Sequence, residues 1–316
     1  MTTATPQSAS PSFPRRTGAP RLAISALLLA CACVAGAILG TKPLLGKADP
    51  LAVTFVQIAA STAVMFAAGM VRRRLPHPVR DIRLALPGLL QPGLAYILAF
   101  SGLALIPASL EGLLTAFESA MVALLAWMLL GERPGRATRL AIVAGTIGVA
   151  MMTGAGLGNG MTSVIGIALV LAGVACASLD TVAARHLAPG AHPLTMTIAG
   201  HFAALCASGA LLLLWPRPID WHWLADARLV WGAIATGVLV HGIATLLFNF
   251  ALAHVTAATT AAILPVISLL TAAGGTVVLG ERLGAVEMLG GSIIIASSLI
   301  AALMPGKGSA TRPTAA

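Results

Sequence analysis

About ten long apolar segments, separated by short polar stretches, dominate this sequence of 316 residues. Each is close to the roughly 20 residues that an α-helix needs to cross the hydrocarbon core of a bilayer. The segments lie at about 22–39, 51–71, 84–105, 109–130, 140–153, 164–184, 194–214, 229–253, 257–279 and 285–303. Only 9% of the residues are charged, whereas a soluble domain carries about 25% to face water. The sequence therefore predicts an all-α integral membrane protein with about ten transmembrane helices.

The placement of basic residues predicts the orientation in the membrane. Lys and Arg number 19 against 10 Asp and Glu, which gives a net charge of +9. In a soluble protein such an excess suggests nucleic acid, but here the basic residues lie in short loops between apolar segments, so we expect no nucleic acid partner. If the chain starts in the cytoplasm, most of the basic residues fall on the cytoplasmic side, as the positive-inside rule requires. We therefore expect a multi-pass protein of the inner cell membrane with both termini cytoplasmic.

A short motif occurs twice, at Gly131-Glu132-Arg133 and at Gly280-Glu281-Arg282, an offset of 149 residues. Each half of the chain then holds five apolar segments, and an odd number forces the second half to enter the membrane from the opposite side. Inverted repeats of this kind are a transporter architecture, in which two equivalent halves surround a site near the middle of the bilayer. The expected organisation is a disordered cytoplasmic tail, a first five-helix repeat, a linker, a second five-helix repeat and a cytoplasmic tail. These parts correspond to residues 1–21, 22–153, 154–163, 164–304 and 305–316.

The first apolar segment also has features of a cleavable signal peptide. Arg15, Arg16 and Arg21 precede it, and it ends in small residues around Gly36. Because the segment is part of the repeat, we expect it to be retained as a membrane helix. The Gly36-x-x-x-Gly40 pattern permits close helix packing, and a homodimer is one use of such a pattern.

Residues 22–304 resemble the EamA-type transporters of the drug/metabolite transporter (DMT) superfamily. The resemblance is carried by the two Leu-Gly-Glu-Arg turns, by Ile263-Leu264-Pro265-Val266 and by Lys42-Pro43. It implies a ten-helix secondary carrier of the inner membrane, commonly an exporter of amino acids, metabolites or drugs. The proline commonly seen in the fourth helix of the family is Ala116 here, and the family's Trp-Gly is absent around Cys33.

Glu118, Glu111 and Asp180 lie within apolar segments and are candidates for binding a substrate or a proton. Glu118 is near the middle of the fourth segment, where a carboxylate costs several kcal/mol unless it is protonated, paired or hydrated. Glu111 is seven residues earlier, and there an acid also complements the positive end of a helix. Asp180, in the sixth segment, fits an ion pair with Arg185 or Lys42 as well as a place in a cavity.

Four uncharged or weakly basic polar residues complete the candidate site: His201, His241, Asn249 and Tyr96. Histidine titrates near neutral pH and can relay protons, but a membrane histidine also serves to bridge helices. Tyr96 fits either the lining of a cavity or the packing between helices. Gly131, Glu132, Gly280 and Glu281 mark the family turn, where we expect them to fix loop geometry and not to contact substrate.

The sequence gives no sign of catalysis. The four cysteines lie inside apolar segments without CxxC spacing, so we expect neither a metal nor another cofactor. The Gly-rich run at 154–160 follows an apolar segment and lacks the strand–turn–helix context of a dinucleotide loop, which predicts a connection between the halves. No nucleophile elbow, HExxH or P-loop is present. We therefore predict a secondary-active transporter that exports small metabolites, amino acids or drugs by alternating access, with proton uptake by Glu118 as the expected coupling. The alternative is a membrane-embedded enzyme or lipid-handling protein without transport activity.

Overall fold

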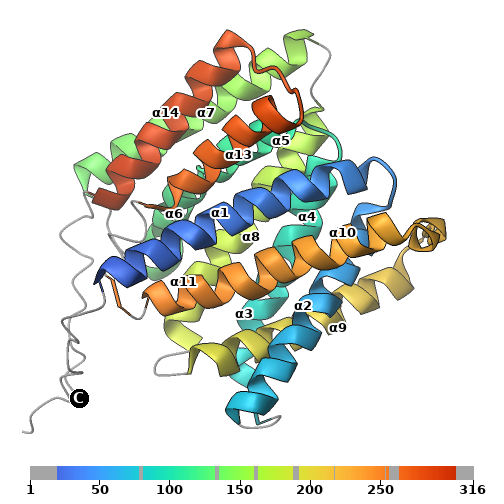
Figure 1. The fold of residues 1–316 in the computed structure, drawn as a ribbon. Coiled ribbons are helices and arrows are strands. Elements are labelled where there is room, and N and C mark those ends of the chain that lie inside the picture. Colours follow the sequence, from blue (N-terminus) through green and yellow to red (C-terminus); the bar gives the residue numbers. More distant parts are fainter. Residues whose placement is uncertain are drawn as a thin grey trace, which may run out of the picture.

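The computed structural model describes residues 20–77, 81–131, 135–159, 163–187, 192–216, 218–252, 254–255 and 263–303. Within these ranges the ordered elements are all helical. Figure 1 shows long helices lying side by side in a bundle, with shorter helical pieces interrupting several of them.

Both halves are built from the same succession of helices. The first half contains α1 (Pro20–Leu45), α2 (Pro50–Arg72), η1 (Ile82–Leu84), α3 (Leu86–Gly88), η2 (Leu89–Leu94), α4 (Ala95–Leu103), α5 (Ala108–Thr115), α6 (Glu118–Leu130) and α7 (Arg136–Asn159). The second half contains α8 (Val164–Leu187), α9 (Pro193–Leu214), η3 (His222–Ala225), α10 (Ala227–Gly237), η4 (Val238–Ala244), α11 (Thr245–Leu252), α13 (Pro265–Val278) and α14 (Ala285–Leu303).

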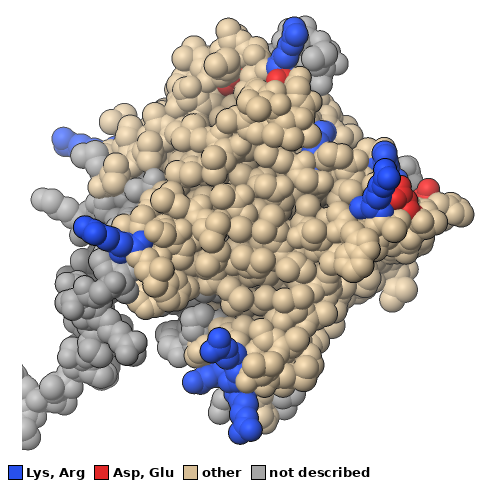
Figure 2. Space-filling view, viewed as in Figure 1, with Lys and Arg blue, Asp and Glu red and all other residues tan. Residues whose placement is uncertain are grey.

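Eight helical stretches of the described chain are long and apolar enough to cross a membrane. They are Arg21–Leu45, Pro50–Arg72, Ile82–Leu103, Ala108–Leu129, Arg136–Gly154, Val164–Ala183, Leu194–Leu214 and Ala227–Phe248. Two shorter apolar helices, Pro265–Val278 and Ala285–Ile300, follow them. In Figure 2 the Lys, Arg, Asp and Glu side chains lie at the edges of the visible face, and uncharged residues cover its middle. The chain is a multi-pass membrane protein, while ten as the number of spans stays a prediction.

The two halves pack against each other in a reciprocal pattern. Helix α7 packs against α14, α5 against α13, and α2 against α9, so that helices from corresponding positions of the two halves are neighbours (Figure 1). Helix α1 packs along α10, η4 and α11, while α8 packs along η2 and α4. The first helix of each half is thus in contact with the third span of the other half, as expected for two equivalent units.

The apolar core is divided between two main clusters of buried side chains. One joins α5 and α8 to α7 and α14, and it includes Leu110, Leu114, Val170 and Ile294. The other joins α1 and α2 to α4 and α10, and it includes Phe100. Each cluster combines helices from both halves, so the main apolar core of the described residues is shared between the halves.

Two glycines allow a close approach between the last helices of the two halves. A Cβ atom placed on Gly148 of α7 would lie 2.7 Å from the carbonyl oxygen of Gly290, and one on Gly290 would lie 2.8 Å from that of Gly148. Both distances are too short for real side chains, so the α7–α14 contact requires glycine on both helices. Such small-residue contacts are the usual way in which membrane helices gain packing energy.

Two helix boundaries differ from the sequence-based expectation. Helix α7 continues to Asn159, so the first residues of the predicted linker at 154–163 are helical. Glycine is more frequent in membrane helices than in soluble ones, so a Gly-rich run is compatible with a continuing membrane helix. The second difference is a break in the fourth segment, which was expected to be continuous.

Candidate functional site

The fourth span consists of two helices, α5 and α6, separated by Ala116 and Phe117. The break occurs at the position where the family commonly has proline, although this chain has alanine there. The Ser298 hydroxyl donates to the Ala116 carbonyl, and the Ser178 hydroxyl donates to the Glu118 carbonyl at 3.4 Å. Side chains from α14 and α8 therefore satisfy backbone groups at the break, as broken membrane helices require.

All three candidate carboxylates lie around this break. Glu118 is in the first turn of α6 and is partly buried, and it interacts electrostatically with Asp180 of α8. Glu111 on α5 is only 3% exposed. Its Oε1 accepts a hydrogen bond of 3.2 Å from the Thr115 hydroxyl, while Oε2 has no partner among the described residues.

Asp180 also has a buried oxygen, Oδ1, without a hydrogen-bond partner in the described chain. The Lys42 ammonium, one of the two partners considered for Asp180, donates instead to the carbonyl oxygens of Leu103 and Ile106. The Arg185 side chain lies outside the described residues. A buried oxygen with unused acceptor capacity is costly unless a proton, a cation or water compensates it, so these carboxylates are suited to binding a proton or a cationic group.

Tyr96 connects the carboxylates to the histidine pair. It interacts electrostatically with Glu111 and Glu118, and its side chain is hydrogen-bonded to Gln91. Its ring lies 4.4 Å from the His241 ring, measured between centroids, in a perpendicular arrangement. His241 is 1% exposed, and neither of its ring nitrogens has a partner among the described residues. The site therefore contains a buried imidazole that contacts the tyrosine next to the acidic groups.

His201 holds the helical turn that carries His241. Its Nδ1 lies 2.8 Å from the Thr197 carbonyl oxygen, and its Nε2 lies 3.0 Å from the His241 carbonyl oxygen. In a regular α-helix the Thr245 amide would donate to His241, but here it donates to Gly242. In the widened turn η4 the His241 carbonyl oxygen therefore does not receive the regular helical hydrogen bond from the Thr245 amide. The His201 ring contacts this oxygen in its place. This contact is structural in kind.

The third span of each half is interrupted at the corresponding place. η2 (Leu89–Leu94) and η4 (Val238–Ala244) begin at residues that differ by the repeat offset of 149; η4 is a π-helical segment, whereas η2 is interrupted by a kink at Gln91. In η2, Gln91 is extended (φ −140°, ψ 123°) because the following residue, Pro92, disfavours helical backbone before it. Widened turns often mark functional sites, and η4 carries His241, while Tyr96 follows the kinked segment η2.

One buried amide was missed by the sequence analysis. Gln57 of α2 is fully buried, and its Nε2 donates to the hydroxyl groups of Thr41 and Thr236 at 2.9 and 2.8 Å. Its Oε1 has no partner within the described residues. An amide in the middle of an apolar segment was itself the available signal, since polar groups inside a membrane helix usually bridge helices or contact ligand.

In both copies of the family turn, a glycine allows the chain to change direction after a helix. Gly131 and Gly280 have left-handed backbone (φ 67° and 69°), which ends α6 and α13. Glu281 accepts hydrogen bonds from the Ala108 and Ser109 amides at the start of α5. Glu132 and the Asn249 side chain lie outside the described residues.

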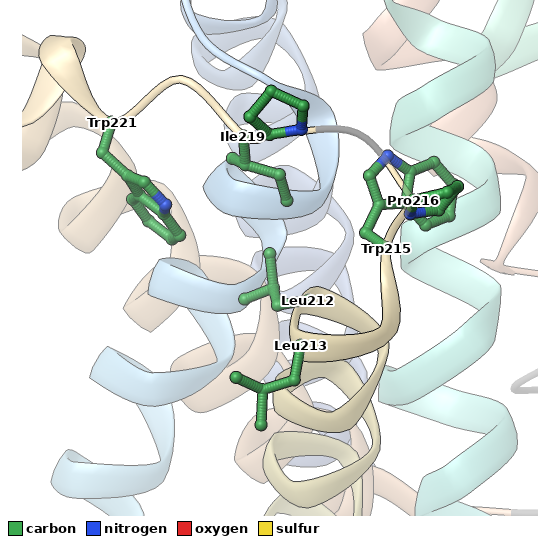
Figure 3. Close-up of a pocket in the computed structure, with 7 residues that line it drawn as sticks. Leu212, Leu213, Trp215, Pro216, Ile219 and Trp221 are labelled. Carbon is green, nitrogen blue, oxygen red and sulfur yellow. The ribbon is translucent and has the colours of Figure 1, made fainter.

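A groove of about 340 Å³ lies away from these residues, where the chain leaves α9. It is lined by Leu212, Leu213, Trp215, Pro216, Pro218, Ile219 and Trp221. Figure 3 shows the two leucines on the last turn of α9, with Trp215 and Trp221 on opposite sides of them. Tryptophan is typical of the membrane–water interface, so this groove marks the edge of the apolar region. Among the described residues, no three His, Cys, Asp or Glu side chains are placed to hold a metal ion.

Comparison with protein families gives a match that spans both halves. The model of the EamA-like transporter family matches residues 21–154 and again residues 164–303. The chain belongs to the EamA-like transporter family. As an EamA-type member of the DMT superfamily it is a membrane transporter, and its two matched regions are the two repeats.

Comparison with solved structures supports the fold. Eighteen chains are similar. One, described only as a crystal structure of a protein, has a TM-score of 0.61 and 20% sequence identity, covering 91% of this EamA chain and 98% of the other. At this identity the likeness concerns the fold alone. No curated protein sequence matches this chain.

Proposed function

We propose that this EamA-type protein is a secondary-active carrier that exports small metabolites, amino acids or drugs across the inner membrane by alternating access. In this proposal ten helices form two inverted halves, both chain ends are cytoplasmic, and a transported ion supplies the energy. The break in the fourth span supports the proposal, because broken helices in carriers expose backbone and side-chain groups near the middle of the bilayer.

The observation that carries the proposal is the group of Glu111, Glu118 and Asp180 around that break. Glu111 and Asp180 each have a buried oxygen without a hydrogen-bond partner in the described chain. Packing alone gives no reason to place three acids together in an apolar bundle, since each burial is costly. Binding and release of a proton, or of a cationic substrate group, gives a reason. Proton coupling through Glu118 follows from its place directly after the break.

Transport by purified protein in liposomes tests the proposal. A panel of amino acids, organic cations and nucleosides is offered with and without an imposed pH gradient. We expect the wild-type protein to accumulate at least one class uphill. Glu118→Gln should lose gradient-driven accumulation and retain exchange down a concentration gradient, because the amide keeps the shape but binds no proton.

Glu287→Gln is the matched control. Glu287 is also buried, but it accepts a hydrogen bond from the Gly284 amide at the start of its own helix, and an amide oxygen can do the same. This variant should transport like the wild type. Gradient-driven accumulation that survives in Glu118→Gln would remove the coupling role of Glu118, and absence of any transport by the wild type would contradict the carrier itself.

A further inference from the structure

The short turn between α4 and α5 is held at both ends by charged side chains from other parts of the chain. The Lys42 ammonium on α1 donates to the carbonyl oxygens of Leu103 and Ile106 at 2.7 and 2.8 Å. The Glu281 carboxylate, directly after the Gly280 turn, accepts from the amides of Ala108 and Ser109 at 2.7 and 2.8 Å.

Each charge has the sign that its helix end requires. The C-terminal end of a helix presents unpaired carbonyl groups and a partial negative charge, and the N-terminal end presents unpaired amides and a partial positive charge. Lys42 contacts the end of α4, and Glu281 contacts the beginning of α5. The residue before α5 is Pro107, which has no side-chain oxygen to cap the helix. Glu281 therefore supplies the cap from the other half of the protein.

The backbone around Glu281 is shaped for this contact. Gly280 is left-handed and turns the chain after α13, and the Glu281 amide donates to the Gly275 carbonyl at 3.0 Å. A Cβ on Gly275 would lie 2.9 Å from the Ser109 amide nitrogen, so α13 approaches the start of α5 at a distance that only glycine allows. Lys42 and Glu281 also interact electrostatically with each other. We call these two side chains and the turn they hold, residues 103–109, the latch.

We propose that the latch closes one end of the transport path, and that the α4–α5 turn must be released from Lys42 and Glu281 before substrate passes to that side. The latch joins α1 and α5 of the first half to α13 of the second, so it can form only while these three helices lie together at this end. It also fixes the start of the helix that carries Glu111, two residues after Ser109. This inference rests on the proposed carrier function, and the charge distribution of the loops assigns the latch to the outer face.

Accessibility of Ser109 measures the latch without a substrate. Ser109 is fully buried beside Glu281, so a cysteine there reacts with a thiol reagent only when the turn is released. Ser109→Cys is introduced after replacing the four native cysteines, and the purified protein in liposomes is treated with a membrane-impermeant maleimide from each side. We expect slow labelling in this background, from the outer side.

The variants separate the latch from general packing. Lys42→Met and Glu281→Gln each remove a charged partner of a helix end. The rate of labelling should become at least about tenfold faster, because the loss of one charge-assisted hydrogen bond changes an equilibrium by about this factor. Lys42→Arg keeps the charge and the donors, so it should remain protected. Arg282→Gln, which changes the exposed neighbour of Glu281, should label like the background. If one latch variant does not fold, the other tests the same turn from its opposite end.

Exchanging the two charges gives the sharpest result. In Lys42→Glu/Glu281→Lys an ordinary ion pair would be restored, but each side chain would then face a helix end of the wrong polarity. We expect the exchanged protein to label at least as fast as the single variants. Recovery of slow labelling by the exchange, or unchanged labelling in both single variants, would overturn the latch. These results do not depend on transport, so a wild type that transports nothing would refute the carrier proposal and leave the latch to be judged by labelling.

Discussion

Replacing Gly148 by alanine should weaken the contact between the two halves. The new Cβ would lie 2.7 Å from the Gly290 carbonyl oxygen and from the Ile294 side chain, whereas ordinary contact begins at 3.4 Å. Helices α7 and α14 would have to separate by about 0.7 Å, and overpacking of this kind costs about 1–3 kcal/mol. Alanine has a helix propensity about 1 kcal/mol more favourable than that of glycine. This gain offsets part of the cost of the clash, so the measured loss of stability is smaller than that cost.

Gly154→Ala on the same helix removes this ambiguity. A Cβ at Gly154 meets nothing within 4 Å, so this variant reports the helix preference alone. Thermal unfolding of the two variants in one detergent should show Gly148→Ala less stable than Gly154→Ala by about 1–3 kcal/mol. Gly290→Ala should behave like Gly148→Ala, and the double variant should cost less than the sum, because one displacement relieves both clashes. Equal stability of Gly148→Ala and Gly154→Ala would refute the reasoning.

Two further predictions concern hydrogen bonds that hold helices in place. Asp49 caps α2 through its Oδ1, which accepts from the Leu51 amide at 2.8 Å, so Asp49→Ala should lower the free energy of unfolding by about 1 kcal/mol, while Asp49→Asn should retain most of it in the same thermal assay. His201→Leu leaves the His241 carbonyl oxygen without its ring partner and should cost about 1–3 kcal/mol. His254→Leu, at an exposed site, serves as control, and equal losses at both histidines would contradict the role given to His201.

The candidate carboxylates could be found from the sequence because the reasoning needed only their position in apolar segments. Glu111, Glu118 and Asp180 are expensive in hydrocarbon wherever the helices lie, so each was a candidate before any contact was known. Their surroundings could not be found in this way. The break after α5 occurs at Ala116 without a proline, and it is Ser298 and Ser178, from two other helices, that contact the backbone there.

The role of Glu281 shows the same limit. The recurrence of Glu132 as Glu281 identified the turn, and these residues were expected to fix loop geometry. The hydrogen-bond partners of Glu281 are the Ala108 and Ser109 amides, more than 170 positions earlier in the chain. A carboxylate accepts hydrogen bonds from any amide that approaches it, and sequence spacing does not tell which helix end will do so. Gln57 was missed although, like Asn249, it is a neutral amide inside an apolar segment.

The sequence by itself determined that this chain lies in a membrane as helices and that it consists of two related halves. These properties follow from composition, segment length and repeated motifs, which are local or periodic. The tertiary structure alone decided which helices of the two halves touch, where the helices break, and which backbone groups the buried charges contact. Those outcomes depend on contacts between residues far apart in the chain, where steric fit and hydrogen-bond geometry, and not residue type, select the partner.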